Sequence, residues 1–424
     1  WELKVADAIY HPKTLTLHAQ STKDTTQVSF HAGDLGLTLT GNADLETMMK
    51  KFEKISEKIN EQLKRDSAIN IPELKPFLPE LQLKMSAGKD NPIYNTLDQY
   101  GISFNHIQIE ASTSPAEGLL FDGDVLGLMR DTMRVDTICL KINQDSLGLE
   151  YVTRIVKKPF RNQPSFTVGL AGKIRNTYAD AELTYLDGKG KTGVLLGARM
   201  DKERDGLRFH FFPDRPIVMF HSFSLNSDNY ILYRNIRDIS ADVRFVGEKN
   251  ASLWIHSMPG EKQKELHAEL SQINLDMVTK GFTELPAMRG MLSMDLQYAP
   301  TDSSYMIVAD AHVDSLFYEN GRVGEMGLNA VYLPLSENRH QLDMHLYHEQ
   351  EEISSMTAVY MSGKHSKVEG SLHITDLPMS MLNPFIPDNM AKLSGRMQGE
   401  MIVTGSSEKP AVNGYMQLDT SSVY

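Results

Sequence analysis

The sequence predicts a mostly β protein, an elongated antiparallel sheet with one long amphipathic helix and short helical insertions. Three observations lead to this prediction. Apolar and polar residues alternate over most of the chain, which places one set of side chains on each face of a strand. Turn sequences separate these runs at intervals of roughly 10 to 15 residues, as in an antiparallel meander. A strand–loop–strand unit recurs near the C-terminus, and stacked units extend a sheet.

Length and charge limit the class of protein. Hydrophobic residues make up 41% of the 424 residues, which is lean for this length and favours a thin structure. The net charge of −12, without a basic stripe, argues against nucleic acid and against docking on anionic lipid. No apolar run is long enough for a transmembrane helix. Because the chain begins with Trp1 and has no signal sequence, we expect a segment of a longer protein whose anchor lies outside it.

The N-terminal half begins with a short strand region, 1–43, followed by a helical region, 44–80. Asp44 is a suitable N-cap, and apolar residues recur at helical spacing from Leu45 to Leu63, opposite a face of mixed charge. We expect this helix to dock on a protein surface. Ile71-Pro72 is expected to end it, because proline restricts the preceding residue, and a Pro-rich connector follows.

The remainder of the chain alternates almost without interruption. We divide it into a strand region at 81–264 and a region at 265–424 that holds two degenerate repeats, about 265–318 and 368–424. Short helices are predicted at about 92–100 and 379–385. In the repeats, Gly290 and Gly395 each open a strand, and Tyr318 and Tyr424 follow them at nearly equal spacing. Cys139 lies in an alternating run and is interpreted as a small buried hydrophobe.

Two motifs suggest chemistry that their context argues against. The segment Gly188–Gly193, GKGKTG, matches a phosphate-loop pattern, but an alternating run follows it instead of the helix that would bind phosphate. We predict a hairpin turn there. His340, His345 and His348 cluster beside Glu349, but strand geometry places residues 345 and 348 on opposite faces, so we expect no shared metal. We therefore predict no enzyme activity, no cofactor and no metal site.

The apolar face itself is the remaining candidate site, and two interpretations of it are open. It could pack against a second sheet, as in a sandwich, or it could line a trough that holds a ligand. The 23 methionines suit both an adaptable binding surface and an irregular core.

The final stretch carries a resemblance to a known family. The pattern comprises Leu393-Ser394-Gly395, Met397, Gly399, Met401, Val403, Gly405-Ser406, Pro410, Val412, Gly414, Met416 and Leu418. It resembles the C-terminal repeat of the TamB family, the translocation and assembly module proteins of the AsmA-like group. Lys409 departs from that pattern, where the family usually has Asn. Weaker similarity lies in Ser86-Ala87-Gly88-x-x-Asn91-Pro92, Pro213–Pro216 and Ser224-Leu225-Asn226-x-Asp228-Asn229-Tyr230.

The resemblance implies a curled antiparallel sheet, the β-taco or groove, in a periplasmic protein anchored to the inner membrane. It implies a lipid-conducting bridge that moves phospholipid between the inner and outer membranes, with acyl chains as its partners. Alternatives are an assembly factor for outer-membrane proteins that acts with an Omp85-type barrel, and a structural spacer without cargo. A sandwich-type module for a glycan or protein is a further rival. The family supplies no catalytic residues.

On this interpretation the groove is lined by alternating apolar residues, and the helix over Leu45–Leu63 could cap it. The predicted lining residues are Phe166, Val168, Leu170, Leu183, Val194, Leu196, Met294, Leu296, Met344, Leu346, Met401 and Val403.

Overall fold

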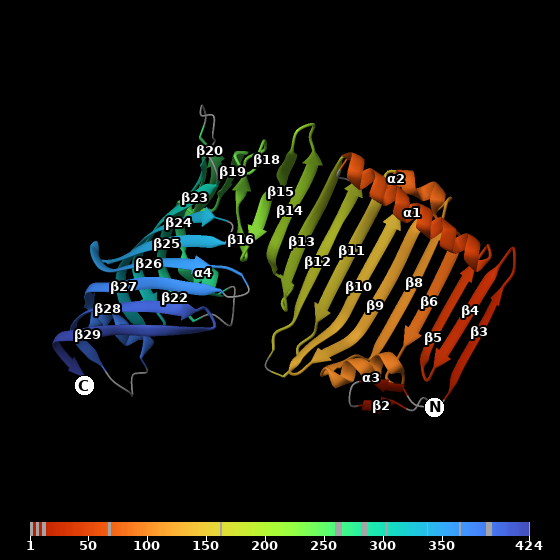
Figure 1. Cartoon of the computed structure of the whole chain (residues 1–424), viewed down its shortest axis with the longest axis horizontal. Coiled ribbons are helices and arrows are strands. Elements are labelled where there is room, and N and C mark those ends of the chain that lie inside the picture. The colour runs from red at the N-terminus through yellow and green to blue at the C-terminus, as the bar shows by residue number, and fades with distance from the viewer. Residues whose placement is uncertain are drawn as a thin grey trace. The chain divides into compact units, whose positions relative to one another are not determined.

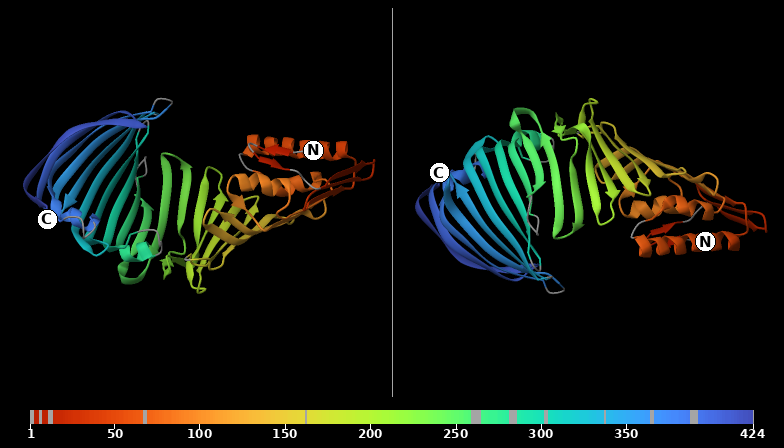
Figure 2. Two further views of the ribbon diagram at one scale, coloured as in Figure 1. Left: turned by 90° about the horizontal axis from the view of Figure 1, so that it is seen from below. Right: turned by 90° about the horizontal axis from the view of Figure 1, so that it is seen from above.

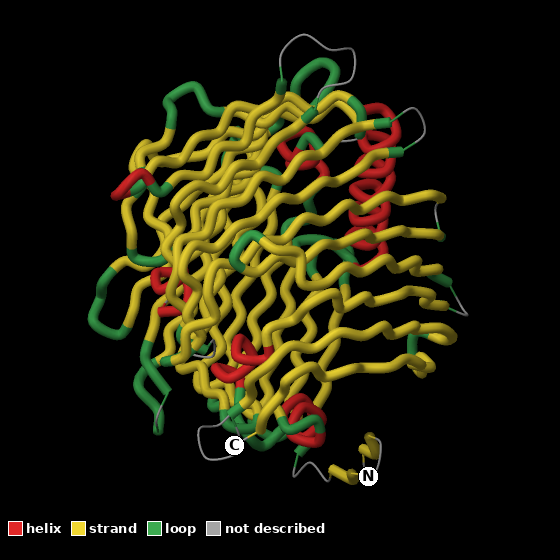
Figure 3. Tube along the Cα trace, turned by 90° about the vertical axis from the view of Figure 1, so that its left-hand side faces the viewer, coloured by secondary structure: helices red, strands yellow, loops and turns green. Residues whose placement is uncertain are grey.

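Antiparallel strands make up most of the computed structural model, which confirms the mostly β prediction (Figure 3). The structure describes residues 3–423 except 6–7, 11–13, 67–68, 162, 259–264, 281–285, 302–303, 337, 364–365 and 387–391. The chain divides into two units, 1–202 and 203–424, and the boundary falls inside the strand region predicted at 81–264. Each unit is described by itself.

Unit 1 contains a large antiparallel sheet and a separate pair, β1 (Leu3–Val5) and β2 (Ala8–Tyr10) (Figure 1). Neighbours in sequence are neighbours in the large sheet, except that β6 pairs with β8 while β7 (Ile102–Ser103) pairs with β9. The sheet strands are β3 (Leu15–Ser21), β4 (Thr26–Ala32), β5 (Leu35–Gly41), β6 (Leu81–Ala87), β8 (His106–Ser114), β9 (Gly118–Arg130), β10 (Met133–Gln144), β11 (Gly148–Lys157), β12 (Phe166–Arg175), β13 (Tyr178–Asp187) and β14 (Thr192–Lys202).

The predicted amphipathic helix is present as α1 (Leu45–Asp66), and the Asp44 carboxylate accepts the Thr47 N–H at 2.8 Å, as expected of an N-cap. Met48 is buried against Gly41 at the end of β5. The prediction that Ile71-Pro72 ends this helix was wrong, since α1 ends at Asp66. This pair opens a second helix, α2 (Ile71–Leu74), which η1 (Lys75–Phe77) follows, because proline fits the first turn of a helix as well as it ends one.

The short helix predicted near residue 92 is present as α3 (Pro92–Gln99) and is held by a network around Asn91. The Asn91 side chain accepts the Tyr94 N–H at 2.9 Å and donates to Asp34 at 2.7 Å and to the Gly88 carbonyl at 2.9 Å. Burial raises the Asp34 pKa, but hydrogen bonds from Asn91, Asp90 and Gly88 outweigh burial and leave the pKa below its usual value. This network fixes α3 to the turn between β4 and β5.

Replacing Asn91 with Ala should reduce the free energy of unfolding by about 1–3 kcal/mol, because it removes a buried residue that caps α3 and leaves its partners unsatisfied. Chemical denaturation of the whole chain measures this. Asn60→Ala, on the exposed surface of α1, is the matched control and should leave stability nearly unchanged. Equal stability of the two variants would contradict the role assigned to Asn91.

Unit 2 contains a curved antiparallel sheet whose strands again follow sequence order over most of its width (Figure 2). Short strands β16 (His221–Ser222) and β17 (Ser224–Leu225) lie near its start. The other strands are β15 (Leu207–Val218), β18 (Tyr230–Asn235), β19 (Asp238–Val246), β20 (Ser252–Ser257), β21 (Leu266–Asn274), β22 (Met288–Pro300), β23 (Tyr305–Tyr318), β24 (Gly321–Ser336), β25 (Arg339–His348), β26 (Glu351–Met361), β27 (Lys367–Pro378), β28 (Leu393–Ser406) and β29 (Lys409–Val423). Its helical segments are η2 (Glu248–Asn250), α4 (Leu275–Lys280) and η3 (Met379–Phe385).

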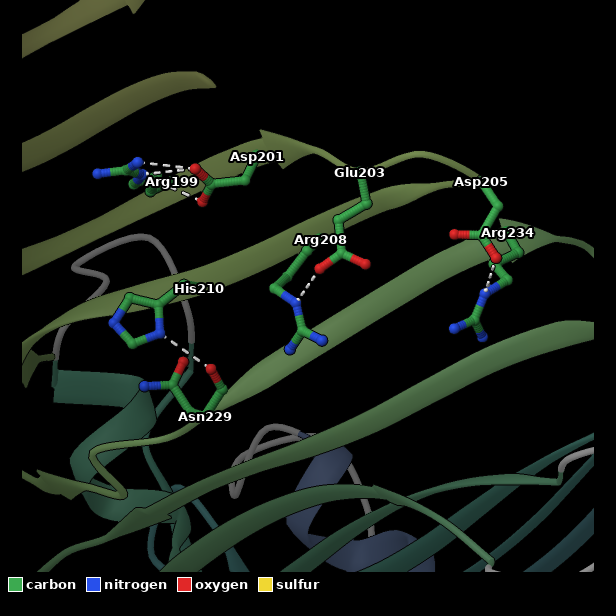
Figure 4. Close-up of polar contacts among 8 residues, drawn as sticks. All are labelled: Arg199, Asp201, Glu203, Asp205, Arg208, His210, Asn229 and Arg234. Atoms are coloured by element: carbon green, nitrogen blue, oxygen red, sulfur yellow. Dashed lines mark hydrogen bonds and ion pairs between the residues drawn. The ribbon is translucent and has the colours of Figure 1, made fainter. Parts of the chain in front are cut away.

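Asn229 ties the first strands of unit 2 together (Figure 4). Its side chain accepts the Phe211 N–H at 2.7 Å and donates to the carbonyls of Phe211 and Asn226 at 3.1 and 2.8 Å. Its own carbonyl lies 2.9 Å from His210 Nδ1. Asn226 in turn accepts the Arg244 N–H at 2.8 Å on β19. The segment 224–230 therefore serves as a structural clamp between β15 and β19.

The predicted repeat is present as a structural unit. In each copy a strand leads through a short helix into two further strands: β21, α4, β22 and β23 in the first, and β27, η3, β28 and β29 in the second. Gly290 and Gly395 both lie at register shifts and have positive φ angles, 147° and 92°. Both glycines are therefore β-bulge residues. Tyr424 lies outside the described residues.

Gly290→Ala should destabilise unit 2 by about 1 kcal/mol or more, because a Cβ there would lie 2.9 Å from Val313 Cγ1 and 3.0 Å from the Asp314 carbonyl. Gly363→Ala is the control, because it introduces backbone strain without a steric clash. Gly363 also has a positive φ, 132°, but a Cβ there meets nothing within 4 Å. Denaturation midpoints should fall further for Gly290→Ala, and the reverse order would contradict the bulge assignment.

Candidate functional site

Every predicted lining residue of unit 1 lies on one face of its sheet, the apolar face. Leu170 pairs with Leu183 and Leu183 with Leu196, so these side chains point to the same side. The same pairing continues to the first strand of the sheet without a break. The row reads Leu17, Phe30, Leu37, Met85, Ile109, Gly123, Leu140, Thr153, Leu170, Leu183 and Leu196, one residue from each strand. Phe166, Val168 and Val194 lie on this face in adjacent rows.

The predicted lining residues of unit 2 also share one apolar face. A single row of paired residues crosses the sheet from β22 to β28: Leu296, Ala309, Ala330, Met344, Met356, Leu372 and Met401. Met294 and Leu346 belong to the next row on one side, and Val403 to the next row on the other. Each unit therefore has a continuous apolar floor.

Helices cover only the ends of the apolar face in unit 1. Met48 of α1 lies against Gly41, and Gln144 at the end of β10 donates to the Ile71 carbonyl of α2 at 3.4 Å. At the other end, Phe104 and side chains of α3 pack with Leu35 and Ala87. Figure 2 shows α1 and α3 on the same side of this sheet. Away from them, Leu170 and Leu183 are 37% and 40% exposed.

The apolar face of unit 2 is likewise covered in part. Met381 and Leu382 of η3 pack with Ile374 and its neighbours in one cluster. On β29, by contrast, Val412, Met416 and Leu418 are more than half exposed. Within its described residues, unit 2 has no second sheet, and the second sheet of unit 1 is only the short pair β1 and β2, which lies next to α3. The described residues therefore favour an open surface over a sandwich within each unit.

The opposite faces carry most of the charged pairs, although exposed apolar side chains such as Val152 and Ile402 also lie there. In unit 1, cross-strand ion pairs lie on this side, including Lys141 with Asp122 at 2.8 Å and Lys173 with Glu150 at 3.1 Å. Arg199 pairs with Asp201 at 2.7 Å, and in unit 2 Arg208 and Arg234 pair with Glu203 and Asp205 (Figure 4). Exposed pairs of this kind contribute little stability, but they identify the side that faces water.

Polar groups occur at one margin of each apolar face. In unit 2, rings stack in sequence from Tyr298 through Tyr305, Tyr332 and His340 to Tyr360, with centroids 5.3 to 6.3 Å apart. Burial raises the pKa of the Tyr298 and Tyr332 hydroxyls, which stay neutral donors.

In unit 1, the polar group on the apolar face is the side chain of Lys157. Lys157 lies on the apolar face, is 8% exposed, and has its ammonium 5.6 Å from the Phe166 ring centroid. Within the part of the chain that the structure describes, its side chain has no carboxylate in ion-pair contact. A largely buried ammonium without a counter-charge favours an anionic ligand nearby.

The sequence motifs have structural roles. Residues 187–191 form the turn between β13 and β14, and the Asp187 carboxylate accepts the Lys189 and Lys191 N–H groups, so the predicted hairpin is confirmed. His345 and His348 lie on opposite faces, as predicted, and His340 stacks on Tyr332. The interpretation of Cys139 was wrong. It is half-buried on the polar face opposite Asp124, because alternation alone does not tell which face is apolar.

Comparison of the chain with protein-family models, with characterised proteins and with solved structures finds no match. The resemblance to the TamB family therefore stays a prediction. Among the helices that the structure describes, none is both long enough and apolar enough to cross a membrane.

Proposed function

We propose that this protein binds the acyl chains of phospholipids on its apolar sheet faces and conducts the lipid along them. The observation that carries this proposal is the row of paired, mostly apolar residues that crosses each sheet, together with its incomplete cover. A soluble protein rarely leaves a large contiguous apolar surface without a partner. Leu170, Leu183 and the β29 side chains are the exposed parts of these surfaces.

Acyl chains suit such a surface energetically. Each buried methylene contributes about 0.8 kcal/mol, whether the chain lies in a bilayer or on an apolar protein face. Transfer between the two costs little net free energy, and movement along a uniform floor needs no chemical step. Methionines such as Met344, Met356 and Met401 adapt to disordered chains because the thioether is flexible.

Head groups would lie at the polar margins. Tyrosine rings combine an apolar body with a hydroxyl donor, which suits the boundary between acyl chains and water. In the series from Tyr298 to Tyr360, Tyr298 donates its hydroxyl hydrogen to the Ile236 carbonyl and Tyr332 contacts His340, so the Tyr360 hydroxyl is the one proposed to reach a head group in unit 2. In unit 1, the Lys157 ammonium could pair with a lipid phosphate.

We further propose that each sheet belongs to an elongated, curled groove of the β-taco type, in a TamB-like protein of the periplasm. On this proposal the full-length protein is anchored to the inner membrane, and the groove leads phospholipid to the outer membrane. The alternative function, assembly of outer-membrane proteins together with an Omp85-type barrel, would need a surface that binds the barrel. Lipid binding on the apolar floor needs no such protein partner. A spacer without cargo would leave the exposed apolar side chains unexplained.

Photo-crosslinking residues at Leu196 and Met401 should capture phospholipid in cells, because both lie on apolar faces. The same photo-crosslinking amino acid placed at Thr184 or Thr404, on the opposite faces, should capture no lipid. Mass spectrometry of the adducts identifies the lipid. Equal labelling on both faces would contradict the proposal, and absence of lipid from all four positions would favour the spacer.

Leu183→Glu should abolish lipid capture at the neighbouring Leu196 position, because a carboxylate on the apolar floor must stay hydrated. Thermal stability should change little, since Leu183 is 40% exposed in the wild type. Thr184→Glu, one residue along on the polar face, is the matched control and should leave capture unchanged. Normal lipid capture by Leu183→Glu would argue that lipid does not contact this floor.

A further inference from the structure

The polar face of unit 2 carries a second cluster, which the lipid proposal does not use. His256 of β20 pairs directly with His267 of β21, and Glu269 of β21 pairs with Asp295 of β22. These side chains lie on the same face, opposite Leu296 and Met294. Four groups that can bind a metal therefore meet on three neighbouring strands.

The distances within this cluster suit one small cation. One ligand atom from each of His267, Glu269 and Asp295 lies within 4.8 Å of the other two. His256 Nε2 is 2.9 Å from a Glu269 carboxylate oxygen, and His267 Nδ1 is 3.2 Å from an Asp295 oxygen. In tetrahedral zinc sites, ligand atoms about 2.1 Å from the metal lie about 3.4 Å from one another. His256 lies outside this group of three, so its ring must rotate toward the other ligands to complete a tetrahedral set.

Further polar and aromatic side chains lie beside both histidines. His267 Nε2 lies 3.9 Å from a Glu265 carboxylate oxygen, and Gln297 donates to that carboxylate at 2.7 Å. The His256 ring stacks on Trp254 with centroids 3.8 Å apart, and Trp254 Nε1 donates to Asp242 at 3.0 Å. Carboxylates behind ligating imidazoles are typical of metal sites, because they fix the ring and increase its basicity.

Charge and burial also favour a cation. The His256 and His267 side chains are 13% and 16% exposed, whereas Glu269 and Asp295 are about half exposed. Within the described residues, the ion pairs of Glu269 and Asp295 are with these histidines alone. Two carboxylates without a Lys or Arg partner therefore lie beside two imidazoles, and all four groups can bind a cation.

We infer that His256, His267, Glu269 and Asp295 bind one Zn²⁺ ion. Two imidazoles and two carboxylates form a ligand set that zinc accepts, and four protein ligands leave no open position for catalysis. The ion would tie β20, β21 and β22 together on the side of the sheet that faces water. A nearby cluster provides a contrast, since His312 contacts Asp314 and Glu325 but has no second imidazole.

The test uses the full chain, freed of any polyhistidine tag and stripped with a chelator, and titrated with zinc chloride. Equilibrium dialysis should find one zinc per chain, and Trp254 fluorescence should change on binding because its ring stacks on His256. His267→Asn and Glu269→Gln should each weaken zinc binding by about tenfold or more, and Glu265→Gln by about tenfold. His312→Asn is the matched control and should bind zinc like the wild type.

Circular dichroism establishes that each variant is folded before the titration. Failure of the wild type to retain zinc at micromolar concentration would overturn the inference. So would unchanged zinc binding in the His256→Asn/His267→Asn double variant. The result is independent of the lipid proposal, because lipid capture at Leu196 and Met401 is measured on the apolar faces and needs none of these residues.

Discussion

Cross-strand register is the constraint on which this structure depends. Each strand exposes alternate side chains on opposite faces, so a slip of one residue would move an entire apolar set to the water side. The row from Leu17 to Leu196 is continuous only because each pair of neighbouring strands aligns the residues of this face with one another. Register thus converts a local alternation into a continuous apolar floor in each unit.

Specific residues protect that register where the chain departs from regular pairing. Gly290 and Gly395 absorb an extra residue at bulges, and at Gly290 a side chain would clash with the neighbouring strand. Asn91 and Asn229 use their amides to satisfy backbone groups that no strand partner reaches. Helices enter only through the connections between strands, and they settle at the ends of the sheet.

Much of this arrangement could be predicted from the sequence, because alternation is local. It located the strands, α1, α3 and η3, and it placed Leu183 and Met401 in alternating apolar runs. What it could not provide was the neighbour across the sheet. Cys139 was predicted to be buried among apolar residues, but it pairs across the sheet with Asp124 of β9, fifteen residues earlier, and so lies on the polar face. Likewise, Pro72 was taken for a helix end because both ends of a helix tolerate proline.

The zinc cluster shows the same limit most clearly. The alternation of Glu265, His267 and Glu269 was visible in the sequence, but three polar residues on one strand are ordinary for a face exposed to water. Only pairing with His256 and Asp295 from two other strands makes them a ligand set. The denser group at His340–His348 is divided between the two faces of the sheet and cannot combine in this way. In a sheet protein, the density of histidines and carboxylates along the chain is thus a poor guide to a metal site, and their agreement in register across strands is the better one.

By that criterion the two faces of unit 2 have separate chemistry. One face offers an apolar floor with neutral donors at its margin, and the other presents carboxylates and imidazoles suited to a cation. A cation held on the water side can stiffen the sheet without placing charge on the floor.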